Sequence, residues 1–250
     1  MRVSHRIKAK ISRHASDAGI KSLNRLNLPN SILIIPDGNR RWAREMHLPA
    51  GKGHEVGGDT MGKILDFFVN LNTKIVGIWG FSEDNWKREK QEIDNIMNVV
   101  KHTTEINLDK MQKYGVKFIV LGHKDRIKKD YPQVSQVLEN AQKVSAKNTK
   151  KVLVVFLDYG ERFQLEEFAK ERQKDKSSST YELLAKVNKG LPMFDMVLRT
   201  SGELRLSGFG PLASVAEFII VKKNLPELNA TDIALALKEY SGRKRRLGGN

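Results

Sequence analysis

Residues 31–43 read Ser-Ile-Leu-Ile-Ile-Pro-Asp-Gly-Asn-Arg-Arg-Trp-Ala, a short apolar run followed by a turn and a polar segment. After its first position the run Ser31–Ile35 holds only isoleucine and leucine, which is typical of a strand buried on both faces. Pro36 and Gly38 are turn residues that end such a strand. The stretch therefore predicts a buried strand that turns into a helix near Asp37.

Similar apolar runs recur along the chain, with helical segments between them. Strands are expected over 31–35, 74–81, 116–121, 151–157, 196–198 and 217–221. The spacing of apolar residues predicts helices from Asp59 or Thr60 to Val69, from Ile93 to Gly115, over 133–147 and over 231–240. This alternation predicts a single-domain α/β fold with a mainly parallel six-stranded sheet flanked by helices. The polar segment 172–180 is expected to be a solvated loop.

The composition excludes several classes of protein. Of the 250 residues 40% are hydrophobic and 29% charged, which is typical of a globular protein. The chain has no cysteine, so disulfides, thiolate metal sites and cysteine nucleophiles are excluded. No apolar run reaches 18 residues, and no apolar run follows the basic start, so neither a membrane span nor a secretory signal is expected. These features favour a cytoplasmic protein.

The charge points to an anionic partner without identifying it. Lys and Arg total 44 and Asp and Glu 29, which gives a formal net charge of +15. The excess lies in the first 30 residues, through the middle of the chain and at 243–246. Nucleic acid, an acidic membrane surface and phosphorylated metabolites are all compatible with it.

The turn after the first strand carries groups that suit a phosphorylated ligand. Gly38 would let the backbone approach such a ligand, and Arg40 and Arg41 can bind phosphate through forked hydrogen bonds. Asp37 would repel phosphate unless a divalent cation lies between them, so it suggests Mg²⁺. An Asp-Gly turn with solvated arginines is the alternative interpretation of this segment alone.

Two more polar clusters follow expected strand ends, where ligands bind in parallel sheets. They lie at 82–88, with Ser82 and Asn85, and at 199–207. His54 follows a glycine-rich turn and precedes an expected helix, where its side chain can reach a ligand. The glycines of 51–57 do not have the spacing of a dinucleotide fingerprint, and no nucleotide P-loop occurs, so neither cofactor is supported.

These segments resemble the ordered signature blocks of the cis-prenyltransferases, the undecaprenyl diphosphate synthase family. The resemblance covers nearly the whole chain from Ser31 onward, and both the blocks and their order match. It implies a catalytic domain over 31–250 preceded by a basic, helical N-terminal extension over 1–30. The blocks are 37–43 (DGNRRWA), 53–57 (GHEVG), 81–88 (FSEDNWKR), 158–162 (DYGER), 199–207 (RTSGELRLS) and 246–248 (RLG).

The resemblance implies an enzyme that adds isopentenyl diphosphate to an allylic diphosphate of the farnesyl or geranyl type, with Z geometry and Mg²⁺. It implies a homodimer and allows peripheral membrane contact through the lipid product. By similarity the metal is assigned to Asp37 and Glu217, and the reacting groups are assigned to His54, Ser82 and Asn85. The residues assigned to substrate binding are Gly38, Asn39, Arg40, Arg41, Trp42, Trp86, Arg88, Arg199, Arg205, Ser207, Arg246 and Gly248, with Arg246 reaching the neighbouring subunit.

The chain departs from the family pattern at several positions. Ala50 stands where many members have an arginine, Asp158 and Glu161 stand where asparagine and glycine are usual, and Pro36 replaces a methionine. The stretch before Glu217 lacks the usual aromatic and glutamine residues and is one residue short.

Three alternatives to regular chain elongation stay open. One is an irregular, branching condensation of two allylic units, and another is a noncatalytic subunit of a prenyltransferase. The third is a basic nucleic-acid-binding protein, although no zinc spacing, sheet motif or recognition helix accompanies the charge, so nucleic acid is not expected as a partner.

Product length depends on the depth of an apolar tunnel. Its walls are expected to be the sheet and the helices at 61–71 and 88–111. Phe67, Phe68 or Trp79 would either form its floor or pack in the core.

Overall fold

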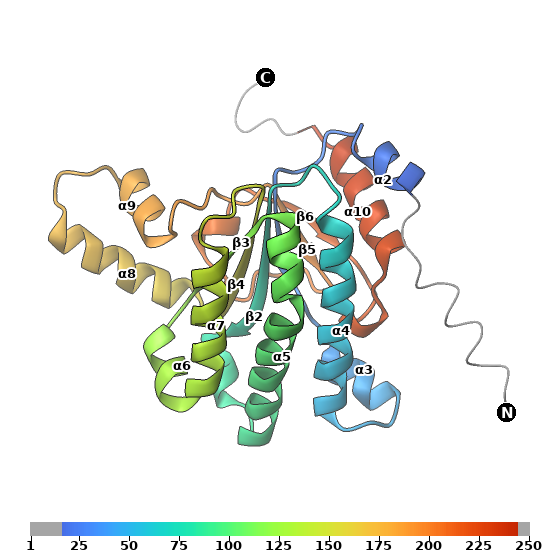
Figure 1. Cartoon of the computed structure of the whole chain (residues 1–250), viewed down its shortest axis with the longest axis horizontal. Helices are drawn as coiled ribbons and strands as arrows, with labels where there is room; N and C mark the ends of the chain where they lie inside the picture. Colours follow the sequence, from blue (N-terminus) through green and yellow to red (C-terminus); the bar gives the residue numbers. More distant parts are fainter. Residues whose placement is uncertain (1–16, 245–250) are drawn as a thin grey trace, which may run out of the picture.

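Six parallel strands form one sheet in the order β3-β4-β2-β1-β5-β6 within residues 17–244, the part of the chain that the computed structural model describes (Figure 1). Every neighbouring pair of strands runs parallel. The strands are β1 (Ser31–Ile35), β2 (Ile75–Ser82), β3 (Val116–Leu121), β4 (Lys151–Tyr159), β5 (Met196–Arg199) and β6 (Glu217–Ile220). The predicted sheet is confirmed, and every strand begins and ends within two residues of its expected bounds.

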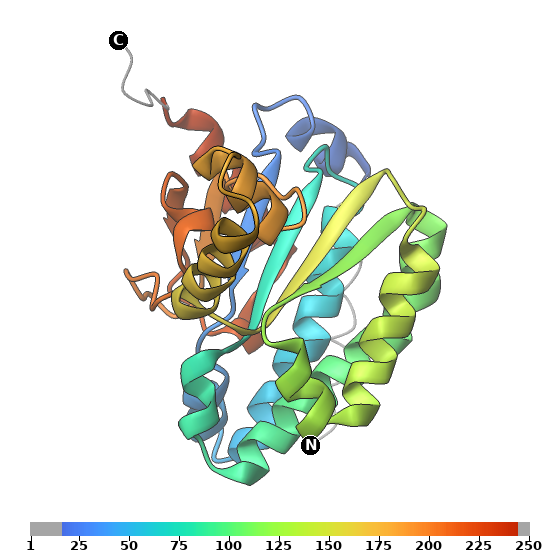
Figure 2. The ribbon, with the colours of Figure 1, turned by 90° about the vertical axis from the view of Figure 1, so that its left-hand side faces the viewer.

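Helices cover both faces of the sheet (Figure 2). One face carries α2 (Asp17–Leu23), α4 (Ala50–Phe68), α5 (Lys90–Tyr114), α6 (Lys124–Asp130), α7 (Pro132–Ser145) and α10 (Ala230–Gly242). The other carries α8 (Glu161–Lys174) and α9 (Thr180–Val187). The remaining elements are α3 (Asn39–Glu45) and the short helices η1 (Glu83–Lys87), η2 (Pro211–Ala213) and η3 (Leu225–Glu227).

Strand β1 contributes alternate side chains to two hydrophobic cores, one on each face of the sheet. Ile32 and Ile34 lie in the core beneath α4 and α5, whereas Leu33 and Ile35 lie in the core on the opposite face. The second core is rich in aromatic side chains, among them Phe156, which contacts its neighbours edge-to-face. A strand buried on both faces holds its carboxyl end rigidly, which suits a site built on the turn that follows it.

The helices confirm the expected pattern with two corrections. Gly115 ends α5 in the left-handed conformation, with φ +65°, as its position predicted. The segment 51–57 was expected to be a turn but is the first part of α4, which begins at Ala50 rather than near Thr60. Glycine has a low helix propensity, so the sequence pattern hid these turns of helix. The polar loop 172–180 is shorter than expected, because α8 continues to Lys174 and α9 begins at Thr180.

The described part of the expected N-terminal extension, residues 17–30, packs onto the domain. Its helix α2 ends at Leu23, which is buried in the same core as α4 and α10. No helix between residues 17 and 244 is both long and apolar enough to cross a membrane.

Candidate active site

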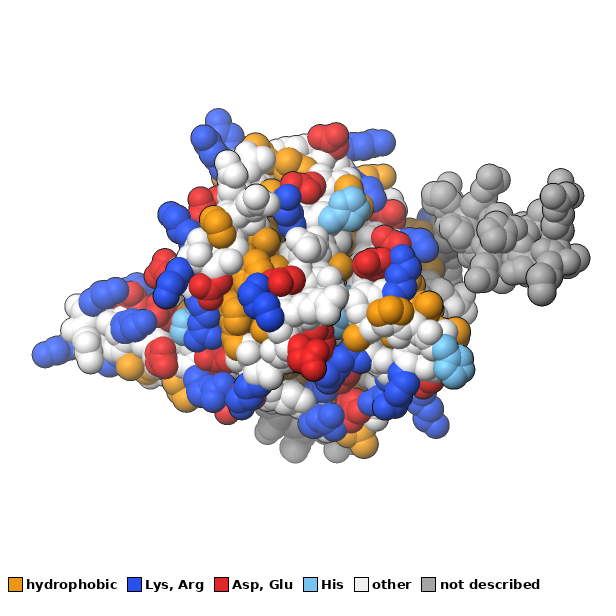
Figure 3. All heavy atoms as spheres, turned by 90° about the horizontal axis from the view of Figure 1, so that it is seen from below, with side chains coloured by type: hydrophobic (Ala, Val, Ile, Leu, Met, Phe, Trp, Pro, Cys, Tyr) orange, Lys and Arg blue, Asp and Glu red, His pale blue; other side chains and the backbone are white. Residues whose placement is uncertain are grey.

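A polar cleft of about 820 Å³ lies beyond the carboxyl ends of β1, β2 and β5. Figure 3 views this side of the molecule and shows basic and acidic side chains close together on it. The predicted residues that line the cleft are Asp37, Gly38, Asn39, Arg40, Arg41, His54, Ser82, Asn85, Arg88, Arg199, Arg205 and Ser207. The sheet thus brings together side chains that are as much as 170 positions apart in the sequence, from Asp37 to Ser207.

Asp37 lies just after the carboxyl end of β1 and is held there by residues at the end of the neighbouring strand β5. Its backbone N–H donates to the Thr200 hydroxyl at 2.7 Å, and that hydroxyl donates to the Asp37 carbonyl oxygen at 2.7 Å. The Asp37 carboxylate accepts from the Arg199 guanidinium at 3.0 Å. The Arg199 side chain is only 4% exposed, whereas that of Asp37 is 35% exposed. A buried cation therefore orients a carboxylate that still faces the cleft.

Only glycine fits beside Asp37 in this turn. Gly38 has φ +95°, and a Cβ atom at this position would lie 2.0 Å from the Ser201 hydroxyl oxygen. Its N–H donates to the Asp37 carboxylate at 2.7 Å. The Asp-Gly pair is thus fixed by tertiary contacts, which argues against a merely solvated turn.

The loop after β5 places a second cationic group in the cleft. The Arg199 guanidinium donates to the Ser207 hydroxyl at 3.1 Å and also to the Arg205 carbonyl oxygen. Ser201 and Ser207 both adopt positive φ values, which curl the loop back on itself. Arg199 therefore links the loop to Asp37, and Arg205 stays on the cleft wall.

Glu203 joins the two groups of arginines, a role that was not predicted from the sequence. One carboxylate oxygen accepts from Arg41 at 2.8 Å, and the other accepts from Arg205 at 2.5 Å. The Arg41 hydrogen bond is the main cause that lowers the pKa of Glu203. Glu203 thus bridges the segment after β1 and the loop after β5. Its position two residues before Arg205 was the feature of the sequence that could have indicated this role.

A second ionic cluster surrounds His54 on α4. Its Nδ1 faces the Asn39 amide at 3.3 Å, and its Nε2 lies 3.2 Å from Glu92. Glu92 also accepts from Arg88 at 2.7 Å and lies 3.6 Å from Arg40. Burial lowers the pKa of His54 despite the carboxylate, so the ring is neutral near pH 7. Glu92 was not predicted as a site residue, although its spacing four residues after Arg88 on a helix was a signal.

Ser82 and Asn85 meet at the end of β2. The Ser82 N–H donates to the Asn85 side-chain oxygen at 3.1 Å, which caps η1 and presents both residues to the cleft.

The two tryptophans expected to bind substrate do not line the cleft. Trp86 packs edge-to-face on Phe81 at 5.2 Å, and the Arg126 guanidinium lies over its ring at 5.1 Å. Trp42 is half-buried on α3. Packing thus accounts for the position of Trp86, and the assignment of both tryptophans to substrate binding stays a prediction.

Glu217 was expected to share a metal with Asp37, and within one chain this is wrong. Glu217 is the first residue of β6 and pairs in register with Met196, the first residue of β5. Asp37 follows the last residue of β1, so the two carboxylates lie at opposite ends of the sheet. Glu217 instead accepts from Arg243 at 2.9 Å.

The donor set around Asp37 fits Mg²⁺ that is held mainly by a substrate. Among residues 17–244 no group of three His, Asp or Glu side chains could hold a metal. One carboxylate completed by phosphate oxygens and water is a usual environment for Mg²⁺ in phosphate sites. Asp37 is therefore the residue that would hold the ion.

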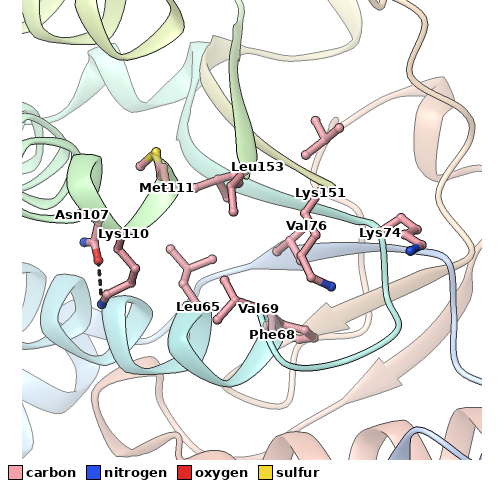
Figure 4. Close-up of a pocket in the computed structure, with 12 residues that line it drawn as sticks. Leu65, Phe68, Val69, Lys74, Val76, Asn107, Lys110, Met111, Lys151 and Leu153 are labelled. Atoms are coloured by element: carbon pink, nitrogen blue, oxygen red, sulfur yellow. Dashed lines mark hydrogen bonds between the residues drawn. The ribbon is translucent and has the colours of Figure 1, made fainter. Parts of the chain in front are cut away.

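Two apolar cavities, together called the tunnel, follow the cleft between the sheet and helices α4 and α5. The first cavity, about 120 Å³, shares His54, Gly80 and Ile96 with the cleft. A further cavity of about 40 Å³ lies at the amino ends of the strands and shares Leu65 and Met111 with the first (Figure 4). The two cavities are small and lined mainly by apolar side chains, and together they form the tunnel to which a hydrocarbon chain is assigned below.

The structure separates the three aromatic side chains expected near the tunnel floor. Phe68 lines the last cavity. Phe67 lines none of the three cavities and packs in the core. Trp79 lies in the core on the opposite face of the sheet and borders only the cleft, so it is not a floor residue.

We expect Gly53→Ala to destabilise the protein, because α3 and α4 meet at this glycine. A Cβ atom on Gly53 would lie 2.1 Å from the Asn39 carbonyl oxygen, so the helices must separate at a cost of roughly 1–3 kcal/mol. Gly62→Ala on the same helix is the matched control. Its Cβ would meet only the Asn107 amide at 4.0 Å, so a gain of up to about 1 kcal/mol is expected. Urea denaturation measures both, and equal effects would contradict the close helix contact.

Comparison with known proteins identifies relatives over most of the chain. The family model described as "Putative undecaprenyl diphosphate synthase" matches residues 35–248. An isoprenyl transferase of Oceanobacillus iheyensis is 35% identical over 235 residues, which cover 89% of this chain and 91% of the relative. A geranylgeranyl-diphosphate-specific tritrans,polycis-undecaprenyl-diphosphate synthase of Pyrococcus horikoshii is 33% identical over 234 residues, which cover 88% and 87%.

A solved structure supports the fold. Lavandulyl diphosphate synthase from Lavandula x intermedia, in complex with dimethylallyl diphosphate, superposes with a TM-score of 0.82 at 23% identity. The match covers 91% of this chain and 99% of that one.

Proposed function

This chain belongs to the undecaprenyl diphosphate synthase family of prenyltransferases, and from that premise we propose that it joins isopentenyl diphosphate to an allylic diphosphate of the farnesyl or geranyl type with Z geometry. The observation that carries the proposal is an arginine-lined cleft that opens into a narrow apolar tunnel. A molecule with a diphosphate head and a hydrocarbon tail has the same two parts in the same order.

The cationic groups of the cleft divide between two diphosphates. Arg40 and Arg41 at the start of α3 are assigned to the allylic diphosphate, because they follow Asn39, which borders both the cleft and the first apolar cavity. Arg199, Arg205 and Ser207 on the β5 loop are assigned to isopentenyl diphosphate. Two such anions repel each other strongly at short range, so both sets of arginines are needed for joint binding.

Asp37 and Arg199 would stabilise the charge that develops when the allylic carbon–oxygen bond breaks. Asp37 would hold Mg²⁺, which when bound neutralises part of the charge on the departing pyrophosphate. Arg199 fixes the carboxylate that carries out this role. Because these groups are held in place before the reaction, little reorganisation is needed in the transition state.

Ser82, Asn85 and His54 lie around the point where the new carbon–carbon bond would form. Asn85, anchored on Ser82, is assigned to the isopentenyl unit, which loses a proton as the bond forms. Neutral His54 borders both the cleft and the tunnel, so it would position the allylic end of the chain.

We place the active protein in the cytoplasm as a homodimer that meets the membrane through its lipid product. Within residues 17–244 the strand β6 pairs only with β5, which leaves an edge with the half-buried Phe218 for a second copy. The tail residues Arg246 and Gly248, assigned to the partner's cleft, lie outside the described residues.

Product analysis tests the function. The purified chain is incubated with Mg²⁺, isopentenyl diphosphate and farnesyl or geranyl diphosphate, and dephosphorylated products are separated by chromatography. We expect Z-polyprenyl products longer than the starter. Products formed from dimethylallyl diphosphate alone would instead indicate a branching condensation, and no transfer by the isolated chain would indicate a noncatalytic subunit.

We expect Arg205→Lys to weaken isopentenyl diphosphate binding and to leave the allylic substrate little affected. Lysine keeps the charge but loses the planar fork that binds a diphosphate through paired hydrogen bonds. A loss of roughly 1–3 kcal/mol corresponds to a rise in KM of about 5-fold to 150-fold for one substrate. KM values measured separately for each substrate check this, and equal rises would show that the assignment of the β5 loop is wrong.

A further inference from the structure

The tunnel ends among lysine side chains at the amino edge of the sheet. Lys151 is the first residue of β4, Lys74 directly precedes β2, and Lys110 lies on α5. All three border the last cavity together with apolar side chains, as Figure 4 shows. A charged group does not stabilise a hydrocarbon chain beside it. The lysine-lined end of the tunnel therefore differs chemically from the apolar walls that precede it.

The three lysines are held differently. Lys110 forms an ion pair with Asp66 on α4, which draws its ammonium to the rim. Lys74 is exposed. Lys151 is half-buried, and its ammonium donates to the carbonyl oxygens of Leu71 at 2.5 Å and of Thr73 at 2.6 Å. Lys151 therefore borders the last cavity and is tied to the loop between α4 and β2.

We propose that the Lys151 ammonium is the stop that limits the length of the prenyl chain. The inference rests on the proposed function, because it needs a chain that grows from the cleft into the tunnel. The end of that chain would pass Leu65 and Met111 and then meet Lys151. Further growth would have to break two charged hydrogen bonds or bury the ammonium against hydrocarbon, and both are unfavourable.

Replacing the charge by an apolar side chain of similar length tests the stop. In Lys151→Met we expect products longer by one or more five-carbon units, with the rate of the first condensation unchanged. Lys151→Arg keeps a cation and should keep the wild-type lengths. Lys63→Met is the matched control, because Lys63 is exposed on α4 and borders none of the three cavities.

The pH dependence of product length provides a second test that needs no variant. Burial, with repulsion from Lys74, lowers the pKa of Lys151 to about 8, so the ammonium is mostly present near pH 7 and mostly lost at about pH 9. The other charged groups at this end are Lys110 and Asp66, which neutralise each other. Wild-type products should therefore be longer at the higher pH, and those of Lys151→Met should not change.

The outcomes separate the two proposals. An active Lys151→Met with wild-type product lengths would overturn the stop and leave the proposed function intact. If this variant fails to fold, unchanged lengths of wild-type products between the two pH values would overturn the stop instead. A wild-type chain that transfers no prenyl group contradicts the proposed function itself.

Discussion

Replacing Asp37 with alanine should lower turnover roughly a thousandfold or more, which corresponds to about 4 kcal/mol of activation free energy. Asp37 faces the cleft from the end of a buried strand, and within residues 17–244 it belongs to no larger set of metal ligands that could replace it. Loss of its carboxylate therefore removes the protein's hold on the proposed Mg²⁺. Steady-state assays with both diphosphates measure the effect, and EDTA should stop the wild-type enzyme until Mg²⁺ is restored.

The fold should survive this substitution with a moderate loss of stability. Arg199 would lose its carboxylate partner but would keep its hydrogen bonds to Ser207 and to the Arg205 carbonyl oxygen. Because Asp37 is itself 35% exposed, we expect a cost of about 1–2 kcal/mol rather than that of a fully buried pair. Asp37→Asn keeps the shape of the side chain but removes its charge, so it separates the effect of the lost charge from that of the lost side chain. Near-normal activity in a folded Asp37→Ala protein would disprove the role of the turn in catalysis.

The sheet was predictable because its strands carry their own signal. A run such as Ser31–Ile35, buried on both faces, needs no partner to be recognised as a strand. The first turns of α4 were not predictable in this way. Gly53 and Gly57 lie where α3 approaches α4 closely, and that contact outweighs their poor helix propensity. Tertiary packing of this kind cannot be detected from spacing alone.

Much of the cleft was predictable because parallel strands end at the same edge. The rule brought Asp37, Ser82 and Arg199 together from three separate segments. The same rule would have excluded Glu217, which begins a strand rather than following one. Glu92 and Glu203 were missed because acidic residues among arginines are indistinguishable in sequence from a solvated ionic surface.

Truncation after Lys244 should lower turnover by roughly a hundredfold or more and leave the fold intact, because it removes the tail with Arg246 and Gly248. The cut keeps α10 and also Arg243, which pairs with Glu217 and Glu239. Truncation after Ser241 would break these ion pairs and confuse loss of structure with loss of the tail. Thermal melting and size-exclusion chromatography check that the shortened chain folds and dimerises, and full activity in it would remove any role for the tail.

Mixing experiments then decide whether the tail acts on its own cleft or on that of its partner. The truncated chain keeps Asp37 but lacks the tail, whereas the Asp37→Ala chain keeps the tail but lacks the carboxylate. If the tail acts across the dimer, one cleft of each mixed dimer has both parts, and the other has neither. Random exchange makes half of the dimers mixed, so recovery should reach about a quarter of wild-type activity. If the tail served its own chain, every cleft would lack one part, and mixed dimers would stay inactive.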